Sequence, residues 1–153
     1  INLIKFSRKL KFNYPDFLTH SEEVLTKNKV VTEFEKSNVL VKFIEPENVY
    51  KSLVNYINNS DDEENLKNLL LENVTPSNKI QINSNANTII YFFKSLKKDS
   101  YLVSKTNADI SLWIIKNFLF FHNKEYKIFK KDTVQKTLDR DGKVPHSKIL
   151  YLS

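Results

Sequence analysis

The sequence lacks cysteine and methionine, and it contains a single glycine, Gly142. Without cysteine the chain forms no disulfide framework, no thiolate zinc site and no cysteine nucleophile. With one glycine it cannot build the glycine-rich phosphate loops of P-loop or dinucleotide-binding proteins. These absences exclude most kinase, NTPase and Rossmann-type functions. They also agree with a reducing compartment, and we expect a cytoplasmic protein.

Long apolar runs are also missing. The longest run, Ile110–Phe121, is interrupted by Lys116 and Asn117 and falls short of the roughly 20 residues that a membrane helix needs. Residues 1–14 carry four cations among their apolar positions, unlike a signal peptide. The first residue, Ile1, is not methionine, which suggests a processed product or a sequence that starts inside or just after the natural start. We expect no membrane association.

The chain does contain enough apolar and aromatic material for a folded core. Of its 153 residues, 41% are hydrophobic, and they include eleven Phe, seven Tyr and one Trp. Burial of one Phe-sized side chain stabilises a fold by roughly 1.5–3 kcal/mol. The length fits one ordinary domain or two small ones.

Charge divides the chain into two halves. Residues 1–76 carry 10 Lys/Arg against 12 Asp/Glu, a net charge of −2, whereas residues 77–153 carry 14 against 6, a net charge of +8. The turn-forming segment Thr75–Asn78 lies at this change and predicts a boundary between a helical region, 1–76, and a basic domain, 77–153. A net charge of +8 attracts polyanions such as nucleic acid. The alternative is an ordinary solvated surface rich in lysine.

Apolar spacing predicts helices in most of the first region. Residues 1–14 fit a short helix slightly better than a strand. Residues 21–44 favour a helix, although their β-branched runs also fit a β-hairpin over 29–44. Pro46 suits the first turn of an amphipathic helix that runs to about Asn58.

A second helix of this region starts at Ser60–Glu63, which has the arrangement of a capping box. Its buried side consists of Leu66, Leu69 and Leu70. Although Asp61–Glu64 places four carboxylates in a row, the alternating oxygen ligands and the turn glycine of a calcium-binding EF-hand loop are missing. We therefore interpret the acidic run as a helix start, where the helix dipole favours negative charge.

Three helices are expected in the basic domain, over residues 88–98, 108–120 and 132–140. A short strand at Ile80–Ile82 precedes the first, and asparagine and serine at 83–87 supply its N-cap. A capping box at Thr106–Asp109 starts the second helix, which is apolar almost all round, so Trp113 belongs to the core. A connection of about ten residues leads to the third.

The third helix has Asp132 as its natural N-cap and Gly142 after its end, and residues 148–152 form a plausible short strand. The predicted fold class is mainly α, with a helical N-terminal region followed by a winged-helix-like three-helix C-terminal domain with a short β element.

The third helix also carries the candidate binding face. Val134 and Leu138, four residues apart, would dock onto the core. The opposite face would then present Thr133, Lys136, Thr137 and Arg140. In a major groove, lysine and arginine donate to guanine or phosphate, and threonine contacts phosphate or the thymine methyl group. The DNA backbone would be held by four further lysines, namely Lys130, Lys131, Lys143 and Lys148.

Catalytic and metal-binding patterns are missing. His20, His122 and His146 are isolated, with no metal-ligand spacing and no adjacent nucleophile pattern. We expect no enzymatic activity, no cofactor and no metal ion.

Several stretches resemble a known family. Residues Asn85–Leu96, Tyr101–Val103 and Asn107–Phe118 resemble the C-terminal region of the RteC family, regulators encoded on conjugative transposons of Bacteroides-type bacteria. Residues Val41–Pro46, with Tyr50 and the Leu53–Tyr56 stretch after them, are similar to the helical N-terminal region of that family. The resemblance implies an all-α N-terminal domain, a winged-helix-like DNA-binding C-terminal domain and a role in the transcriptional control of element excision.

We therefore expect a DNA-binding transcriptional regulator associated with a mobile genetic element, with double-stranded DNA as its partner. The choice between DNA and RNA and the formation of a homo-oligomer both stay open. The alternative is a non-enzymatic protein–protein interaction module or adaptor with a helical-bundle fold.

Overall fold

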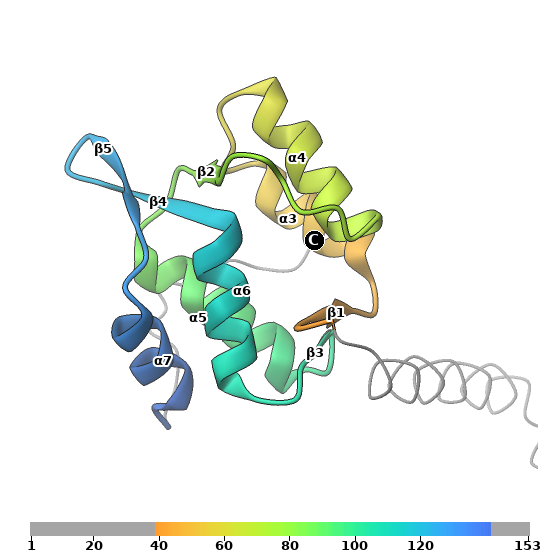
Figure 1. The fold of residues 1–153 in the computed structure, drawn as a ribbon, viewed down its shortest axis with the longest axis vertical. Helices are drawn as coiled ribbons and strands as arrows, with labels where there is room; N and C mark the ends of the chain where they lie inside the picture. The colour runs from red at the N-terminus through yellow and green to blue at the C-terminus, as the bar shows by residue number, and fades with distance from the viewer. Residues whose placement is uncertain (1–38, 142–153) are drawn as a thin grey trace, which may run out of the picture. The chain divides into compact units, whose positions relative to one another are not determined.

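A computed structural model describes residues 39–141, and five helices and five strands lie in this range (Figure 1). In chain order they are β1 Lys42–Phe43, α3 Pro46–Val54, α4 Ser60–Leu71, β2 Ile80–Ile82, α5 Ala86–Lys98, β3 Leu102–Val103, α6 Asn107–Asn117, β4 Phe118–His122, β5 Glu125–Ile128 and α7 Lys131–Asp139. The predicted helix in 1–14, the residues of 21–44 before position 39, Gly142 and the strand at 148–152 lie outside the described residues.

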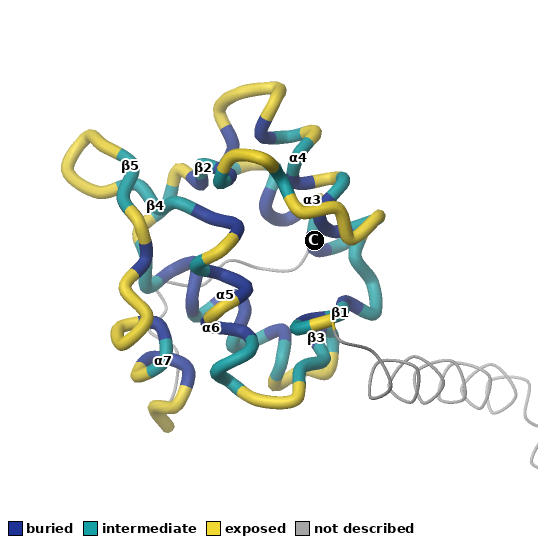
Figure 2. The backbone as a smooth tube through the Cα atoms, in the orientation of Figure 1, coloured by how far each residue is buried: buried dark blue, intermediate teal, exposed yellow. Residues whose placement is uncertain are grey.

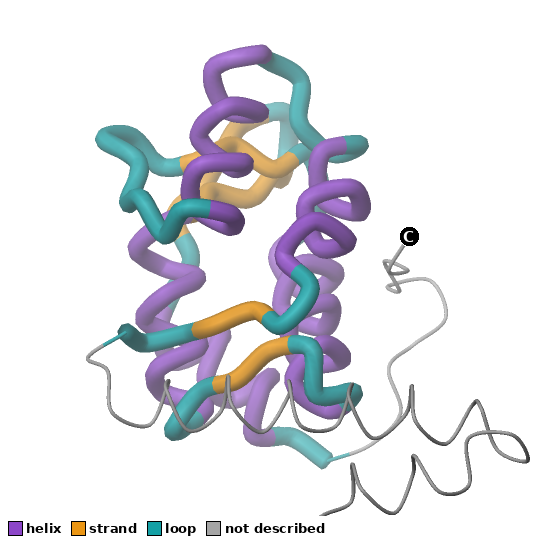
Figure 3. Tube along the Cα trace, turned by 90° about the vertical axis from the view of Figure 1, so that its right-hand side faces the viewer, coloured by secondary structure: helices purple, strands orange, loops and turns teal. Residues whose placement is uncertain are grey.

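The described residues form a mixed α/β structure, so the prediction of a mainly α fold with a winged-helix-like three-helix C-terminal domain is wrong. Strand β1 pairs antiparallel with β3, which also corrects the preferred helical interpretation at Lys42–Phe43. Strand β4 lies in the middle of a second sheet, parallel to β2 and antiparallel to β5. Helices α5 and α6 run between the two sheets (Figure 3).

The main error lies where α6 meets β4. The sequence predicts a helix as far as about Phe120. In the structure α6 ends at Asn117, and the chain continues as a strand from Phe118. Aromatic residues favour strands, and an apolar run in a fully buried strand has the same appearance as one in a buried helix. Pairing with β2 on one side and β5 on the other decides between the two conformations.

The predicted ten-residue connection before the last helix is mostly a β-hairpin. Strands β4 and β5 are joined by Asn123 and Lys124, whose φ angles are 52° and 66°. Positive φ at both central residues is the requirement of a type I′ turn, whose twist matches that of the strands. The hairpin therefore comes before the third helix of this region, whereas the wing of the predicted fold would follow it.

Several local predictions are confirmed. Strand β2 occupies Ile80–Ile82, α3 begins at Pro46, and the Asn85 side chain caps α5 by accepting from Thr88 N–H at 3.0 Å. Both bonds of the capping box at α6 are present. Asp109 N–H donates to Thr106 Oγ1 at 3.2 Å, and Thr106 N–H donates to Asp109 Oδ2 at 3.0 Å.

Other helix ends differ from the prediction by a few residues. Helix α3 stops at Val54 rather than near residue 58. The N-cap of α4 is Asn59 rather than Ser60, and its side chain accepts from Asp62 N–H at 2.8 Å. The N-cap of α7 is Lys130, without a side-chain capping bond, so the predicted cap Asp132 lies inside the first turn.

An aromatic cluster forms the centre of the core. Phe93 of α5 is fully buried, and its ring centre lies 5.4 Å from that of Trp113 and 5.8 Å from that of Phe118. Trp113 also contacts Phe43 of β1, with ring centres 5.3 Å apart. Only 8% of Trp113 is exposed, which confirms that it belongs to the core.

Buried residues lie on both sides of 75–78, a part of the connection between α4 and β2 (Figure 2). Their side chains form one core cluster. The predicted apolar side of α4 is buried, with exposed fractions of 0% for Leu66, 6% for Leu69 and 3% for Leu70. Within residues 39–141, no helix has the length and apolar character needed to cross a membrane.

The cluster makes a direct prediction about stability. Replacement Phe93→Ala removes a fully buried ring that contacts four other aromatic rings, and it should lower the free energy of unfolding by about 3–5 kcal/mol. Urea denaturation followed by circular dichroism measures this difference. Leu112→Ala, at an exposed position of α6, is the control and should change the value by less than about 0.5 kcal/mol. Equal effects of the two replacements would contradict the proposed core.

Candidate nucleic-acid interface

Helix α7 lies at the edge of the fold, with one side against α5 and α6 and the other side exposed (Figures 1 and 2). Val134 is fully buried and Leu138 nearly so, which confirms the predicted docking edge. Thr133, Lys136 and Arg140 are exposed. The inward edge thus fixes the direction in which the three polar side chains project.

Thr137 does not belong to the exposed face, contrary to the prediction. Its exposed fraction is 8%, and its Oγ1 donates to the backbone oxygen of Thr133 at 2.8 Å. The reason is helix geometry, because a residue three positions after Val134 lies only about 60° from it around the axis. Thr137 therefore belongs to the inward edge together with Val134 and Leu138.

The C-terminal end of α7 is held by a lysine from α5. Lys94 Nζ donates to the backbone oxygen of Thr137 at 3.1 Å and also to the backbone oxygen of Arg140. A cation at this end satisfies carbonyl groups that have no partner within the helix and interacts favourably with the helix dipole. Lys94 is therefore committed to structure rather than free to bind a ligand.

A hydrogen bond to Asp139 ties α7 to α6, and a second bond to the same carboxylate comes from within α7. Asn107 Nδ2 donates to Asp139 Oδ1 at 2.8 Å, and Gln135 Nε2 donates to Asp139 Oδ2 at 2.8 Å. These contacts hold the pKa of Asp139 below its ordinary value. The hydrogen bond from Asn107 has the largest effect, the bond from Gln135 contributes less, and the charges of Lys94 and Lys97 act in the same direction. Asp139 is thus an ionised carboxylate with committed partners.

The β4–β5 hairpin carries two lysines that differ in how freely they could bind a ligand. Lys127 Nζ lies 2.9 Å from Glu125 Oε1, and the hydrogen bond and charge of Lys127, with a smaller contribution from His122, lower the pKa of Glu125. Because of this ion pair, the charge of Lys127 is largely offset within the hairpin. Lys124 in the turn is exposed.

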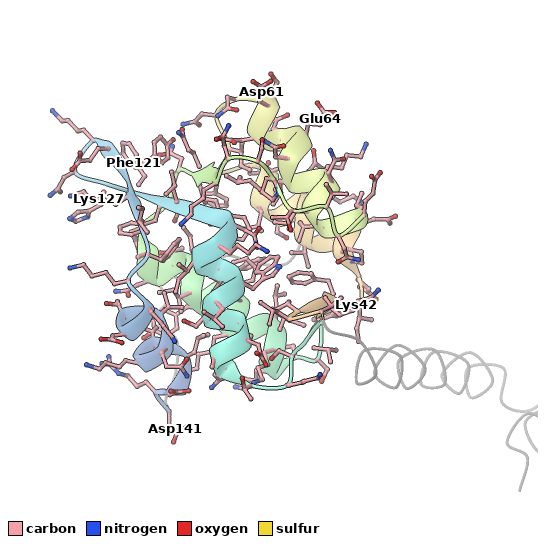
Figure 4. The ribbon with its side chains drawn as sticks, in the orientation of Figure 1. Lys42, Asp61, Glu64, Phe121, Lys127 and Asp141 are labelled. Carbon is pink, nitrogen blue, oxygen red and sulfur yellow. The ribbon has the colours of Figure 1, made fainter. Side chains whose placement is uncertain are left out.

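Five of the eight predicted contact residues are exposed on α7 or beside it, namely Lys130, Lys131, Thr133, Lys136 and Arg140. Within residues 39–141 none of the four cations in this group forms an ion pair. Thr137 is buried, and Lys143 and Lys148 lie outside the described residues. Three carboxylates share the stretch 130–141, so its own net charge is +1, from four cations and three anions. One of them, Asp141, is labelled after α7 in Figure 4.

An open groove lies on another side, between the start of α4 and the three-stranded sheet. Its lining combines amide, carboxylate and apolar side chains, among them Asn59, Asp61, Asn65, Gln81, Leu119, Tyr126 and Ile128. The part of the chain that the structure describes has no group of three or more His, Cys, Asp or Glu side chains placed to hold a metal ion. The exposed cations of α7 are therefore the best candidate for a functional surface.

Comparison with protein-family models, with curated proteins and with solved structures gives no match to this chain.

The contact of Lys94 with the end of α7 can be tested by stability measurements. Replacement Lys94→Met keeps the aliphatic stem and removes the donor, so the last carbonyl groups of α7 lose their partner. The free energy of unfolding should fall by about 1–2 kcal/mol in urea denaturation. Lys98→Met removes the same charge from an exposed position of α5 and should leave stability nearly unchanged. If the two variants were equally stable, the capping role of Lys94 would be excluded.

The hydrogen bond from Asn107 predicts a pH effect. Because the pKa of Asp139 is depressed in the folded state, this residue contributes stability above its unfolded pKa of about 3.9, and that contribution is lost as the pH falls through the folded pKa. Replacement Asn107→Ala should raise the pKa of Asp139 in a carboxyl NMR titration. It should also flatten the loss of stability below about pH 4. Asn55→Ala, which removes an amide from the end of α3, should leave the titration of Asp139 unchanged.

Proposed function

We propose that this protein binds double-stranded DNA through the exposed side of α7 and acts as a transcriptional regulator associated with a mobile genetic element. The observation that carries the proposal is a group of four exposed cations on α7 and at its two caps, Lys130, Lys131, Lys136 and Arg140. Within residues 39–141 none of them forms an ion pair. Such cations are the groups that neutralise phosphates and donate to base edges.

The wider charge distribution supports the same surface. Residues 77–141 carry 12 Lys/Arg against 6 Asp/Glu, whereas residues 39–76 carry 3 against 7. A polyanion is attracted to the first group and repelled by the second. The small net charge of α7 itself is therefore supplemented by the elements that precede it in the chain.

The geometry of α7 suits a DNA groove. An α-helix with its side chains is about 10–12 Å in diameter, which the major groove of B-DNA, about 12 Å wide, admits. The nine residues of α7 give it a length of about 13.5 Å along the groove. Lys136 and Arg140 are one turn apart on the exposed side, so both can reach the same groove. At the other end, Lys130 and Lys131 lie beside the first turn of α7, where N–H groups without a side-chain cap favour a phosphate.

Anchoring of α7 reduces the cost of binding. Val134 and Leu138 are buried, and Lys94 and Asn107 fix the C-terminal turn through hydrogen bonds. A helix held in this way loses little conformational freedom when a ligand binds. Thr133 completes the surface with a hydroxyl group that can donate to a phosphate.

The regulatory role rests on the resemblance to the RteC family, and a cytoplasmic location belongs to the same proposal. The proposed mode of DNA binding differs from that of a winged helix, in which a hairpin follows the recognition helix. In this chain the β4–β5 hairpin precedes α7.

The double replacement Lys136→Ala with Arg140→Ala tests the surface. Affinity for a 30-base-pair duplex, measured by fluorescence anisotropy, should fall by about tenfold or more, and the slope of log K against log salt should decrease by about 2. The matched control is Lys51→Ala with Lys67→Ala, which removes two exposed cations from α3 and α4 and should leave both quantities nearly unchanged.

Equal losses in the two double variants would assign the binding to net charge alone, and undiminished binding after replacement of Lys136 and Arg140 would reject α7 as the interface. A duplex RNA of the same length, titrated in parallel, separates DNA binding from RNA binding.

A further inference from the structure

Strand β5 is an edge strand. The order of the sheet is β2-β4-β5, so β5 has β4 on one side, and within residues 39–141 no strand pairs with its other side. The β4–β5 hairpin projects from the rest of the fold (Figure 1). An exposed edge presents unpaired N–H and C=O groups and is a ready template for another strand.

A hydrogen bond on the far side of β4 shows which residues of β5 direct their backbone N–H and C=O groups away from β4. Phe121 N–H donates to Ser84 O at 2.9 Å, on the side of β4 where β2 lies. Phe121 therefore points its backbone groups away from β5, and its opposite residue, Tyr126, forms a non-hydrogen-bonded pair with it. Since the ladder alternates, Tyr126 and Ile128 direct their N–H and C=O groups to the free edge.

One face of the hairpin carries apolar side chains that are half-buried or, at Ile128, exposed. Tyr126 and Ile128 share this face with their cross-strand neighbours Phe121 and Leu119. The rings of Phe121 and Tyr126 contact each other with centres 5.2 Å apart, and Ile128 is 64% exposed. None of these four side chains belongs to the buried core cluster.

The other face of β5 carries one negative and one positive charge. Glu125 and Lys127 are two residues apart, so their side chains lie on the same face, where they form an ion pair at 2.9 Å. Figure 4 shows Lys127 on the hairpin together with Phe121 of β4. A strand with the order anion, tyrosine, cation has opposite charges placed symmetrically around Tyr126.

We propose that two copies of this chain associate by antiparallel pairing of their β5 strands, around a two-fold axis at Tyr126. In this register Tyr126 is opposite the partner subunit's Tyr126, and their outward N–H and C=O groups bond to each other. Glu125 is then opposite the partner subunit's Lys127, and Lys127 is opposite the partner subunit's Glu125. On the opposite face of the sheet, the apolar side chains of the two hairpins, Ile128 among them, then form one continuous surface.

Other symmetric registers lack this complementarity. A two-fold axis at Glu125 or at Lys127 would place two like charges opposite each other, and the backbone groups of these two residues point towards β4. An axis at Ile128 would pair only the end of the strand. The charges of β5 are therefore complementary to those of a second copy of β5 in one register. This self-complementarity favours a second copy over an unrelated strand as the partner.

The pairing is tested by sedimentation velocity of the full chain at concentrations from micromolar to several hundred micromolar. The unmodified chain should show a concentration-dependent dimer. Replacement Glu125→Lys gives a strand with two cations, and Lys127→Glu gives a strand with two anions, so each variant alone should dimerise at least about tenfold more weakly. An equimolar mixture of the two variants restores opposite charges across the axis and should form a heterodimer with an affinity close to that of the unmodified chain.

Recovery in the mixture distinguishes pairing between chains from the ion pair within one strand, because mixing does not repair either chain by itself. Lys116→Glu, on the exposed side of α6, is the charge-matched control and should dimerise like the unmodified chain. A chain that stays monomeric over the whole range would overturn the proposal, as would dimers indifferent to both charge reversals or a mixture that fails to associate. The experiment contains no nucleic acid, so its outcome is independent of the proposed DNA binding.

Discussion

The contact of Phe93 with Trp113 and Phe118 is the interaction on which the rest of the described fold depends. Phe93 belongs to α5, Trp113 lies in α6, and Phe118 is the first residue of β4. Trp113, one turn before the end of α6, and Phe118, just after it, therefore pack against a single buried ring. Pairing with β2 and β5 decides that the chain is a strand from Phe118, and the packing on Phe93 holds this junction in place against α5. The direction of the β4–β5 hairpin and the surface of α6 that receives α7 both follow from it, so both exposed surfaces with a proposed role rest on the same aromatic cluster.

The sequence predicts those features whose determinants are neighbours in the chain. The N-cap at Asn85 and the capping box at Thr106–Asp109 were identified because their hydrogen bonds join residues three positions apart. The strand β4 could not be identified in this way. Its residues follow α6 in one uninterrupted apolar run, and their conformation depends on pairing with Ile80–Ile82, which comes almost 40 residues earlier. The helical prediction failed where the decisive partner was distant.

The candidate site shows a similar division. The burial of Val134 and Leu138 follows from their spacing, and the outward direction of Lys136 follows from the same helix geometry. Counting charges did not reveal which cations are free. Lys94 and Lys97 contribute to the basic half, yet they are committed to the end of α7 and to the side chain of Asn107. For these lysines only the tertiary contacts separate structural groups from available ones. Thr137 is a different case, because helix geometry alone places it beside Val134 and its hydroxyl group bonds to the backbone of its own helix.

The parallel pairing of β2 with β4 also bears on how the chain reaches this structure. Ile80 pairs with Phe118, and α5, β3 and α6 all lie between them in the chain. Closing such a segment costs entropy before any contact is gained, so the pairing forms late. The β4–β5 hairpin is local and can form within about 1–10 μs. Until β2 pairs with it, β4 has an unpaired edge beside apolar side chains, and such an edge favours aggregation during folding.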